Sequence, residues 1–225
     1  QQLASKLPNG VVRTSTRVQT LRVDGGCATG VVLVDGTTIN AANVVIATEP
    51  AGATALTSMI GMQQYQQIES RGSTSVYFTS ESAPLPGRSL WLNAEPNAII
   101  SHAITLTQVA PEYAPGKHLL VATAVGESAN LSDSQLEDAA RSELARMATV
   151  ANVGAFPESF RVAVRRVPYS QFAQPPGFVP APPEFNGGPT GLWRASELMH
   201  SSSLEGAARG GQHAARALLA RNAGT

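Results

Sequence analysis

The sequence predicts a mixed fold, α/β plus α+β, and three observations carry this prediction. Residues 43–49 have a continuous apolar core, 44–47, and Pro50 ends the segment, which is typical of a strand buried on both faces, as in a parallel sheet. Residues 16–40 alternate in polarity across glycine-containing turns, which indicates an antiparallel meander. Between residues 73 and 167, short apolar segments bounded by Gly, Pro or Ser accompany an amphipathic helix, which favours an antiparallel sheet carrying helices.

The first fifty residues are expected to form a compact strand-rich unit. Gly25-Gly26 predicts one turn, and Asp35-Gly36 is a strong signal for a hairpin. The expected strands lie at 11–13, 16–23, 30–34, 37–40 and 43–49. Taken alone, this segment would be interpreted as a small β-meander.

The middle of the chain differs from the first fifty residues in its pattern of apolar segments and turn residues. Ser132 followed by Gln135 forms a capping-box pattern, which predicts the start of an amphipathic helix there. Its apolar face would consist of Leu136, Ala139, Ala140, Leu144, Met147 and Val150. An earlier helix is expected over 51–62, and strands over 73–79, 89–92, 98–105, 118–126 and 160–167. The proline-laden segment 174–183 should be an extended connector.

The last forty residues predict a strand, a turn and a helix. Leu192 and Trp193 form the apolar strand, and Ser202 with Glu205 forms a second capping-box pattern, so we expect a helix from about residue 203. Behind its start, small residues repeat at helical spacing: Gly206, Gly210 and Ala214, then Ala207, Gly211 and Ala215. Either tight packing on the rest of the fold or the close approach of a ligand would explain this stripe.

Composition excludes several classes of function. With 16 basic and 16 acidic residues the formal net charge is zero, so the chain has no electrostatic footprint for nucleic acid. The single cysteine, Cys27, excludes an internal disulfide and a cysteine-based metal site, and no metal is expected. No run is long enough to span a bilayer and no signal peptide is visible, although a targeting segment could precede Gln1. The four histidines, His102, His118, His200 and His213, are scattered and are interpreted as structural.

The end of the chain resembles the closing flavin motif of a known superfamily. The residues concerned are the run 192–197, then 203–207 and 211–215. They resemble FAD-dependent amine oxidases, protoporphyrinogen oxidases and phytoene desaturases, in which an apolar strand ends at an acidic residue and a Ser-x-x-Gly-Ala helix follows. Ser196 stands where that family usually has Gly, and Glu197 where its nearest members have Asp.

The first fifty residues resemble a second part of the same family. There, a three-stranded meander with an Asp-Gly turn is followed by a strand that returns to the flavin. The resemblance implies that residues 1–50 and 188–225 belong to an FAD-binding domain, and that 51–187 form a substrate domain built on an antiparallel sheet. The chain would then be the C-terminal part of a two-domain FAD fold of the glutathione-reductase type, in which 44–48 contact 192–195.

The resemblance also implies cofactor-binding residues. The edge at Val18 would hold the adenine, and the strand containing Ala47 would run beneath the dinucleotide. Glu197, after Ser196, would hold a ribityl hydroxyl, while the helix start at Ser203 and the N–H of Leu204 would face the flavin. No catalytic residue can be named.

No Gly-x-Gly-x-x-Gly motif is present, and that turn is what carries dinucleotide pyrophosphate. The leading hypothesis is therefore the C-terminal portion of an FAD-dependent oxidoreductase that oxidises an apolar small molecule or an amine by hydride transfer to flavin. Its partner would be the missing nucleotide-binding half or another subunit. The isolated chain should bind FAD weakly or not at all, and should expose an apolar face over 44–48 and the stripe 206–215.

The alternative hypothesis is a cofactor-free interaction or assembly protein that retained the fold after losing the nucleotide-binding half. Under the leading hypothesis we expect a soluble protein, either of a bacterial cytoplasm or of a plastid.

Overall fold

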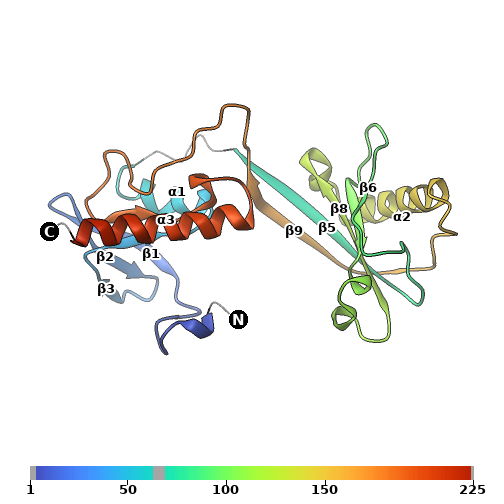
Figure 1. Cartoon of the computed structure of the whole chain (residues 1–225), viewed down its shortest axis with the longest axis horizontal. Helices are drawn as coiled ribbons and strands as arrows, with labels where there is room; N and C mark the ends of the chain where they lie inside the picture. Colours follow the sequence, from blue (N-terminus) through green and yellow to red (C-terminus); the bar gives the residue numbers. More distant parts are fainter. Residues whose placement is uncertain (1–3, 63–68, 224–225) are drawn as a thin grey trace. The chain divides into compact units, whose positions relative to one another are not determined.

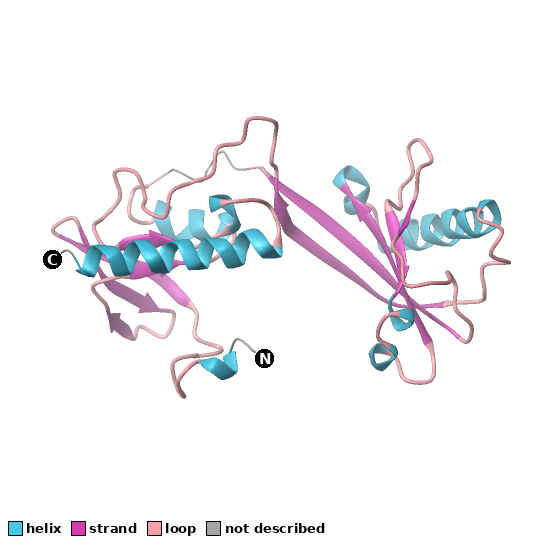
Figure 2. Ribbon diagram, viewed as in Figure 1, coloured by secondary structure: helices cyan, strands magenta, loops and turns pink. Residues whose placement is uncertain are grey.

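The computed structural model describes residues 4–62 and 69–223, and it divides into two compact units. Unit 1 comprises residues 1–69 and 172–225, and unit 2 comprises residues 70–171. Both units combine helices with antiparallel strands (Figures 1 and 2). In the described part of the chain, no helix is both long and apolar enough to cross a membrane.

Unit 1 contains the expected meander and the expected parallel strand. Strands β1 (Val18–Asp24), β2 (Cys27–Leu33) and β3 (Thr38–Asn40) form an antiparallel sheet in that order. Strand β4 (Val44–Ile46) pairs in parallel with β10 (Leu192–Arg194), so that Val44 stands opposite Leu192 and Ile46 opposite Arg194. The expected contact between 44–48 and 192–195 is therefore confirmed.

Four helical segments complete the described part of unit 1. A short 3-10 turn, η1 (Ala4–Lys6), comes first. Helix α1 (Pro50–Ser58) begins with Pro50 in its first turn, and the side chain of Glu49 caps it by accepting a hydrogen bond from the N–H of Gly52. The 3-10 turn η5 (Glu197–Met199) and the long helix α3 (Leu204–Ala223) follow β10. The core of unit 1 includes Leu21 of the meander and Leu198 of η5, together with Ile46, Phe172, Phe185 and Leu192.

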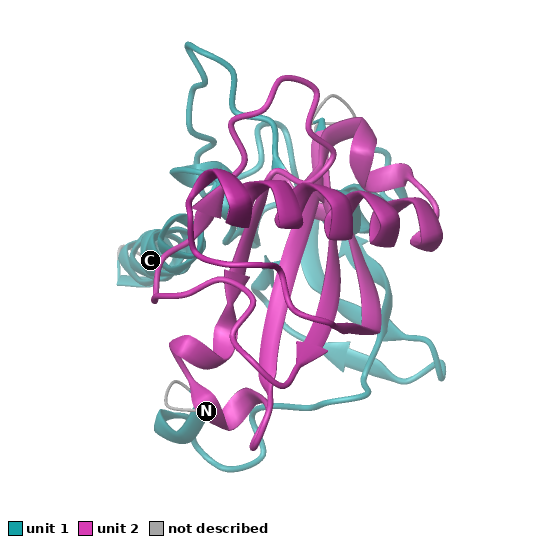
Figure 3. Cartoon of the chain, turned by 90° about the vertical axis from the view of Figure 1, so that its right-hand side faces the viewer, with its two compact units in different colours: residues 1–69, 172–225 teal, residues 70–171 magenta. Residues whose placement is uncertain are grey.

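Unit 2 is an antiparallel sheet with one long helix. The strand order is β6 (Trp91–Leu92), β7 (His102–Thr105), β8 (His118–Val125), β5 (Ser70–Ser80) and β9 (Phe160–Phe172), whose last residue belongs to unit 1. Helix α2 (Asp133–Val150) lies across these strands (Figure 3). Two short 3-10 turns, η2 (Leu106–Gln108) and η3 (Pro111–Tyr113), lie between β7 and β8, and a third, η4 (Gly126–Asn130), leads from β8 to α2.

One face of α2 makes the core of unit 2. Leu136, Ala140, Leu144 and Ala148 are fully or almost fully buried against alternate residues of β5, β7 and β8. The predicted capping box is confirmed, because Ser132 and Gln135 exchange hydrogen bonds between side chain and backbone. Val150, which was expected on the apolar face, is 83% exposed, since the buried stripe ends at Ala148.

Several expected boundaries differ from the structure. Residues 11–13 form no strand, because no neighbouring segment in the described part of the chain pairs with this short run, and Val11 and Val12 are exposed. Residues 51–62 and 174–187, which we expected in the middle domain, lie in unit 1. Phe178 and Phe185 explain this for the second segment, since both pack into the core of unit 1. The assignment of the units to FAD and substrate binding stays a prediction.

Candidate functional site

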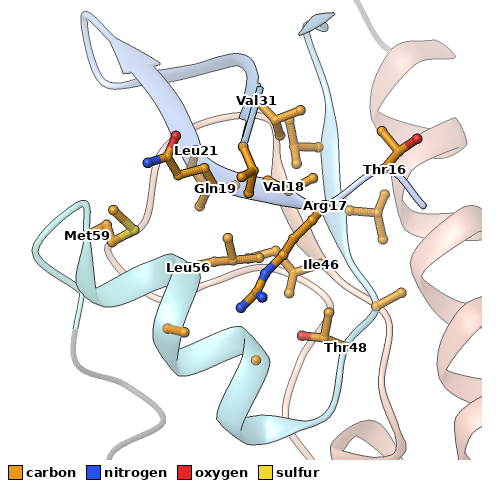
Figure 4. Close-up of a pocket in the computed structure, with 16 residues that line it drawn as sticks. Thr16, Arg17, Val18, Gln19, Leu21, Val31, Ile46, Thr48, Leu56 and Met59 are labelled. Atoms are coloured by element: carbon orange, nitrogen blue, oxygen red, sulfur yellow. The ribbon is translucent and has the colours of Figure 1, made fainter. Parts of the chain in front are cut away.

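A cavity of about 670 Å³ opens in unit 1 between the start of β1, strand β4 and helix α1 (Figure 4). Most of its lining is aliphatic, and it includes both Val18 and Ala47. The lining residues are Thr16, Arg17, Val18, Gln19, Leu21, Val31, Val34, Val44, Val45, Ile46, Ala47, Thr48, Gly52, Ala55, Leu56 and Met59. This composition suits a flat apolar group with few polar contacts.

Arg17 is the only charged residue among the described residues that line the cavity. Its side chain extends from the start of β1 across the opening toward α1 (Figure 4). Sequence reasoning missed Arg17, because nothing in its local pattern distinguishes it from other exposed arginines. Only the folding of α1 beside β1 places its guanidinium over an apolar cavity, where it could contact an anion or an aromatic face.

The parallel pairing of β4 and β10 brings two other predicted residues to one edge. The N–H of Ala195 donates to the carbonyl oxygen of Ile46 at 2.9 Å, which continues the ladder past both strands. Ala47 and Ser196 come next along the two segments, so both lie beyond the carboxyl ends of the strands. In open parallel sheets, ligands bind at that edge.

Ser196 does not offer its hydroxyl outward. Its Oγ is buried and has no hydrogen-bond partner among the described residues. The next residue, Glu197, begins the turn η5 and is partly buried. No ion pair or hydrogen bond to its carboxylate occurs in the described chain, and burial raises the pKa of Glu197 above its ordinary value. A hydroxyl donor placed beside this carboxylate would relieve its desolvation.

The start of α3 differs from the predicted capping box. The hydroxyl of Ser203, not that of Ser202, caps the helix by accepting a hydrogen bond from the N–H of Gly206 at 2.9 Å. Ser202 instead accepts from the N–H of Phe172 at 3.2 Å, and this tertiary contact removes it from the cap. Glu205 pairs with Arg209 one turn along, so the prediction that Ser202 and Glu205 form a box was wrong.

The helix nevertheless begins within one residue of the expected position. Leu204 is its first residue, and its side chain is 94% exposed. The backbone N–H groups in the first turn of a helix have no acceptor within that helix. The N–H of Leu204 can therefore donate a hydrogen bond to an electron-rich oxygen.

The small-residue stripe on α3 has a packing explanation. Gly206, Gly210 and Ala214 are buried, and a methyl group added at Gly206 or Gly210 would clash with the carbonyl oxygen of Ser201 or Ser196 respectively. The expectation that the whole stripe is exposed was wrong for these three residues, because the turn after β10 covers them, whereas Ala207 and Ala215 are exposed. In β4, Val45 is 44% exposed and Ile46 is buried, so only part of that strand is open.

The predicted site residues therefore form two groups within unit 1. Val18 and Ala47 line the cavity, while Ser196, Glu197, Ser203 and Leu204 lie along the turn that leads into α3. The pairing of β4 with β10 joins the two groups through Ala47 and Ser196. No cluster of three or more potential metal ligands occurs among the described residues.

Comparison with known families decides where this arrangement belongs. The model of the flavin-containing amine oxidoreductases matches residues 1–219. The chain belongs to this family. No curated protein matches it.

Solved structures share the fold of this family member at low sequence identity. A candidate protoporphyrinogen oxidase from Exiguobacterium sp. 255-15 is 15% identical, with a TM-score of 0.70. The match covers 97% of this chain and 49% of that protein. A triple mutant of putrescine oxidase is 15% identical, with a TM-score of 0.64. The match covers 98% of this chain and 51% of that protein. An oxidoreductase from Methanosarcina mazei is 15% identical, with a TM-score of 0.59. The match covers 88% of this chain and 48% of that protein. The chain thus spans about half the length of these proteins.

Proposed function

We propose that this chain is the C-terminal portion of an FAD-dependent oxidoreductase that oxidises an apolar small molecule or an amine. The observation that carries the proposal is the family match over residues 1–219, joined to the carboxyl edge of β4 and β10. In this proposal unit 1 is part of a two-domain FAD fold of the glutathione-reductase type. Unit 2 is then the substrate domain.

The residues present fit the cofactor chemically. The cavity beside Val18 is apolar and has one cation, Arg17, which suits an adenine ring with a phosphate nearby. Glu197 presents a partly buried carboxylate without a partner in the described chain, which suits a hydroxyl donor such as that of a ribityl chain. Ala47, directly after β4, lines this cavity.

The residues of this chain would bind and orient the cofactor. Glu197 would accept a hydrogen bond from a ribityl hydroxyl, and the open end of α3 at Leu204 would favour negative charge on a neighbouring carbonyl oxygen. Ser203 keeps that end ordered by capping Gly206, and the close contact of Gly210 with Ser196 fixes the helix behind the turn. Bound flavin would supply the hydride acceptor, as cofactors do in such enzymes.

The pyrophosphate requires a further partner. A glycine-rich turn at a helix start is the usual phosphate cradle, and the sequence has no such motif. We propose that a nucleotide-binding half, provided by a further segment or by another subunit, supplies it. The two-stranded β4–β10 sheet supports this proposal, since parallel sheets normally have more strands and are covered on both faces.

A visible absorption spectrum of the protein together with its nucleotide-binding half tests the proposal. We expect the bands of bound flavin, which bleach when an oxidisable substrate is added without oxygen. A protein that remains colourless after incubation with excess FAD would contradict the proposal. That result would favour the cofactor-free assembly protein.

A further inference from the structure

Helix α3 and the turn before it bring two histidines together. His200 ends the turn η5, and its backbone N–H donates to the carbonyl oxygen of Glu197 at 2.9 Å. His213 lies in the middle of α3. The centres of the two imidazole rings are 6.0 Å apart, and the ring planes are tilted by 49°. The start of α3 lies between the two residues in the sequence, so only the fold makes them a pair.

Close packing of α3 on the turn holds this pair in place. Gly210, in the helical turn before His213, lies against the backbone of Ser196 so closely that no β-carbon fits. Gly206 lies against the backbone of Ser201 in the same way. The helix therefore cannot shift along the turn without losing both contacts. The two rings are brought close by the fold itself, which lowers the entropic cost of binding a ligand between them.

The ring nitrogens of both histidines are free. Within residues 4–62 and 69–223, neither imidazole takes part in a hydrogen bond or an ion pair. His213 is exposed and His200 is half-buried, so the pair lies at the surface. His102 differs, because its Nδ1 lies 3.0 Å from the hydroxyl of Ser101. The pair therefore offers two ring nitrogens on each residue to a ligand.

The charged neighbours of the pair do not exclude a cation. On α3, Arg209 and Arg216 lie one turn to either side of His213. Arg209 forms an ion pair with Glu205, with 2.7 Å between Nη2 and Oε1, which compensates its charge. Arg216 is exposed, so its long side chain can extend into solvent. Within the turn, Glu197 contributes a carboxylate, whose charge favours a cation nearby.

Two imidazoles at this separation suit one transition-metal ion. A bond from zinc to an imidazole nitrogen is about 2.0–2.1 Å long, so two rings that bind the same ion have centres about 5–6.5 Å apart. The observed 6.0 Å lies in this range. Imidazole is a ligand for zinc, copper and nickel, whereas Mg²⁺ and Ca²⁺ prefer oxygen. No third Asp, Glu, His or Cys joins the pair among the described residues, so water would complete the coordination.

We propose that His200 and His213 form a binding site for a divalent transition-metal ion, with Zn²⁺ as the ion used to test it. The bound ion links the η5 turn to α3, and thereby restrains the turn that carries Glu197. The sequence had suggested that these histidines are structural, and the proposal replaces that interpretation. With two protein ligands in place of four, we expect a dissociation constant of about 1–100 µM.

A titration of the chain with Zn²⁺ tests the site. The chain is prepared without a polyhistidine tag, and NMR follows its four histidine rings at about pH 7.5. We expect the ring signals of His200 and His213 to shift together and to saturate at one ion per chain. The signals of His102 and His118 should stay unchanged. Mg²⁺ at the same concentration should shift none of the four, and a chelator should restore the original spectrum.

Single substitutions identify the two ligands by calorimetry. His200→Gln and His213→Gln should each weaken Zn²⁺ binding at least about ten-fold, because losing even a group behind a metal ligand weakens binding about 10–100-fold. His102→Gln is the matched control, since it removes an imidazole of unit 2, and it should leave the affinity unchanged. Saturating Zn²⁺ should also raise the urea midpoint of the unsubstituted chain, but not that of His213→Gln.

The outcomes separate a metal site from a simple contact between two rings. The proposal is overturned if the rings of His200 and His213 do not respond to Zn²⁺. It is also overturned if either glutamine variant binds Zn²⁺ as tightly as the unsubstituted chain, or if His102→Gln loses as much affinity as they do. No step of the test uses flavin, so its result is independent of the proposed function, which the flavin spectrum tests separately.

Discussion

Gly210 of helix α3 lies so close to Ser196 that no β-carbon fits between the helix and the carbonyl oxygen of that serine. The contact joins the helix to the turn that carries Glu197. Gly211, the next residue, has open space around the same position. The two glycines are adjacent in the sequence but have different physical roles.

Alanine substitutions separate these two roles. Gly210→Ala should destabilise the chain by about 1–3 kcal/mol, since the helix must move away from the turn. Gly211→Ala should stabilise it by roughly 0.5–1 kcal/mol, because alanine is the better helix former and meets nothing. Urea unfolding of both variants measures the difference, and equal effects would contradict the packing explanation.

The carboxylate of Glu143 gives a prediction for unit 2. It is 6% exposed and accepts hydrogen bonds from the side-chain amide of Asn93 and from the N–H groups of Ile99 and Ile100, at 2.9–3.0 Å. Glu143→Ala should lower the free energy of unfolding by about 2–4 kcal/mol, because it leaves buried donors unpaired. Glu112→Ala, an exposed acidic residue of the same unit, is the control and should have little effect. A loss no larger than the control's would mean that water replaces the carboxylate.

The raised pKa of Glu197 predicts a pH dependence of stability. A group whose pKa is higher in the folded chain favours folding most at pH below its unfolded pKa, and loses that contribution as the pH rises through the folded value. Without cofactor, Glu197→Gln should therefore have a higher melting temperature than the unsubstituted chain at pH 7, and the gap should close toward pH 4. A gap that widens on acidification would contradict this sign.

Flavin binding should depend on the same carboxylate. A hydrogen bond to a charged group contributes about 1.5–3 kcal/mol, so Glu197→Ala should weaken FAD binding about ten-fold to a hundred-fold in the complete flavoprotein. Glu205→Ala is the matched control, since Glu205 is exposed at the start of α3 and pairs only with Arg209 among the described residues. Unchanged affinity in Glu197→Ala would make Glu197 a solvated carboxylate with no role in binding.

Much of the fold could be predicted because local signals agree with tertiary packing. The Ser132–Gln135 box and the buried residues Leu136 and Leu144 follow directly from spacing. The apolar core of 43–49 correctly indicated a parallel strand, although β4 itself has only three residues. Such features depend on residues close together in the sequence, so their patterns can be recognised from the sequence alone.

The remainder depends on contacts that no local pattern contains. Ser202 satisfies the N-cap pattern as well as Ser203 does, and only the N–H of Phe172, thirty residues earlier, decides between them. In the same way, the place of Arg17 over the cavity and the contact between His200 and His213 arise from packing between separate elements. The candidate site was therefore predicted at Glu197 and Leu204 through a family resemblance, and not from spacing alone.

A calorimetric titration with FAD tests the central claim most directly. The chain is titrated alone and then together with its nucleotide-binding half. Ordering a long flexible ligand is unfavourable, and the contacts at Val18, Glu197 and the start of α3 are few, so we predict weak or undetectable binding to the chain alone. We predict tight binding, with one FAD per complex, once the second half is present. Sub-micromolar binding to the chain alone would show that its own contacts suffice, and no binding to the complex would contradict a flavoenzyme.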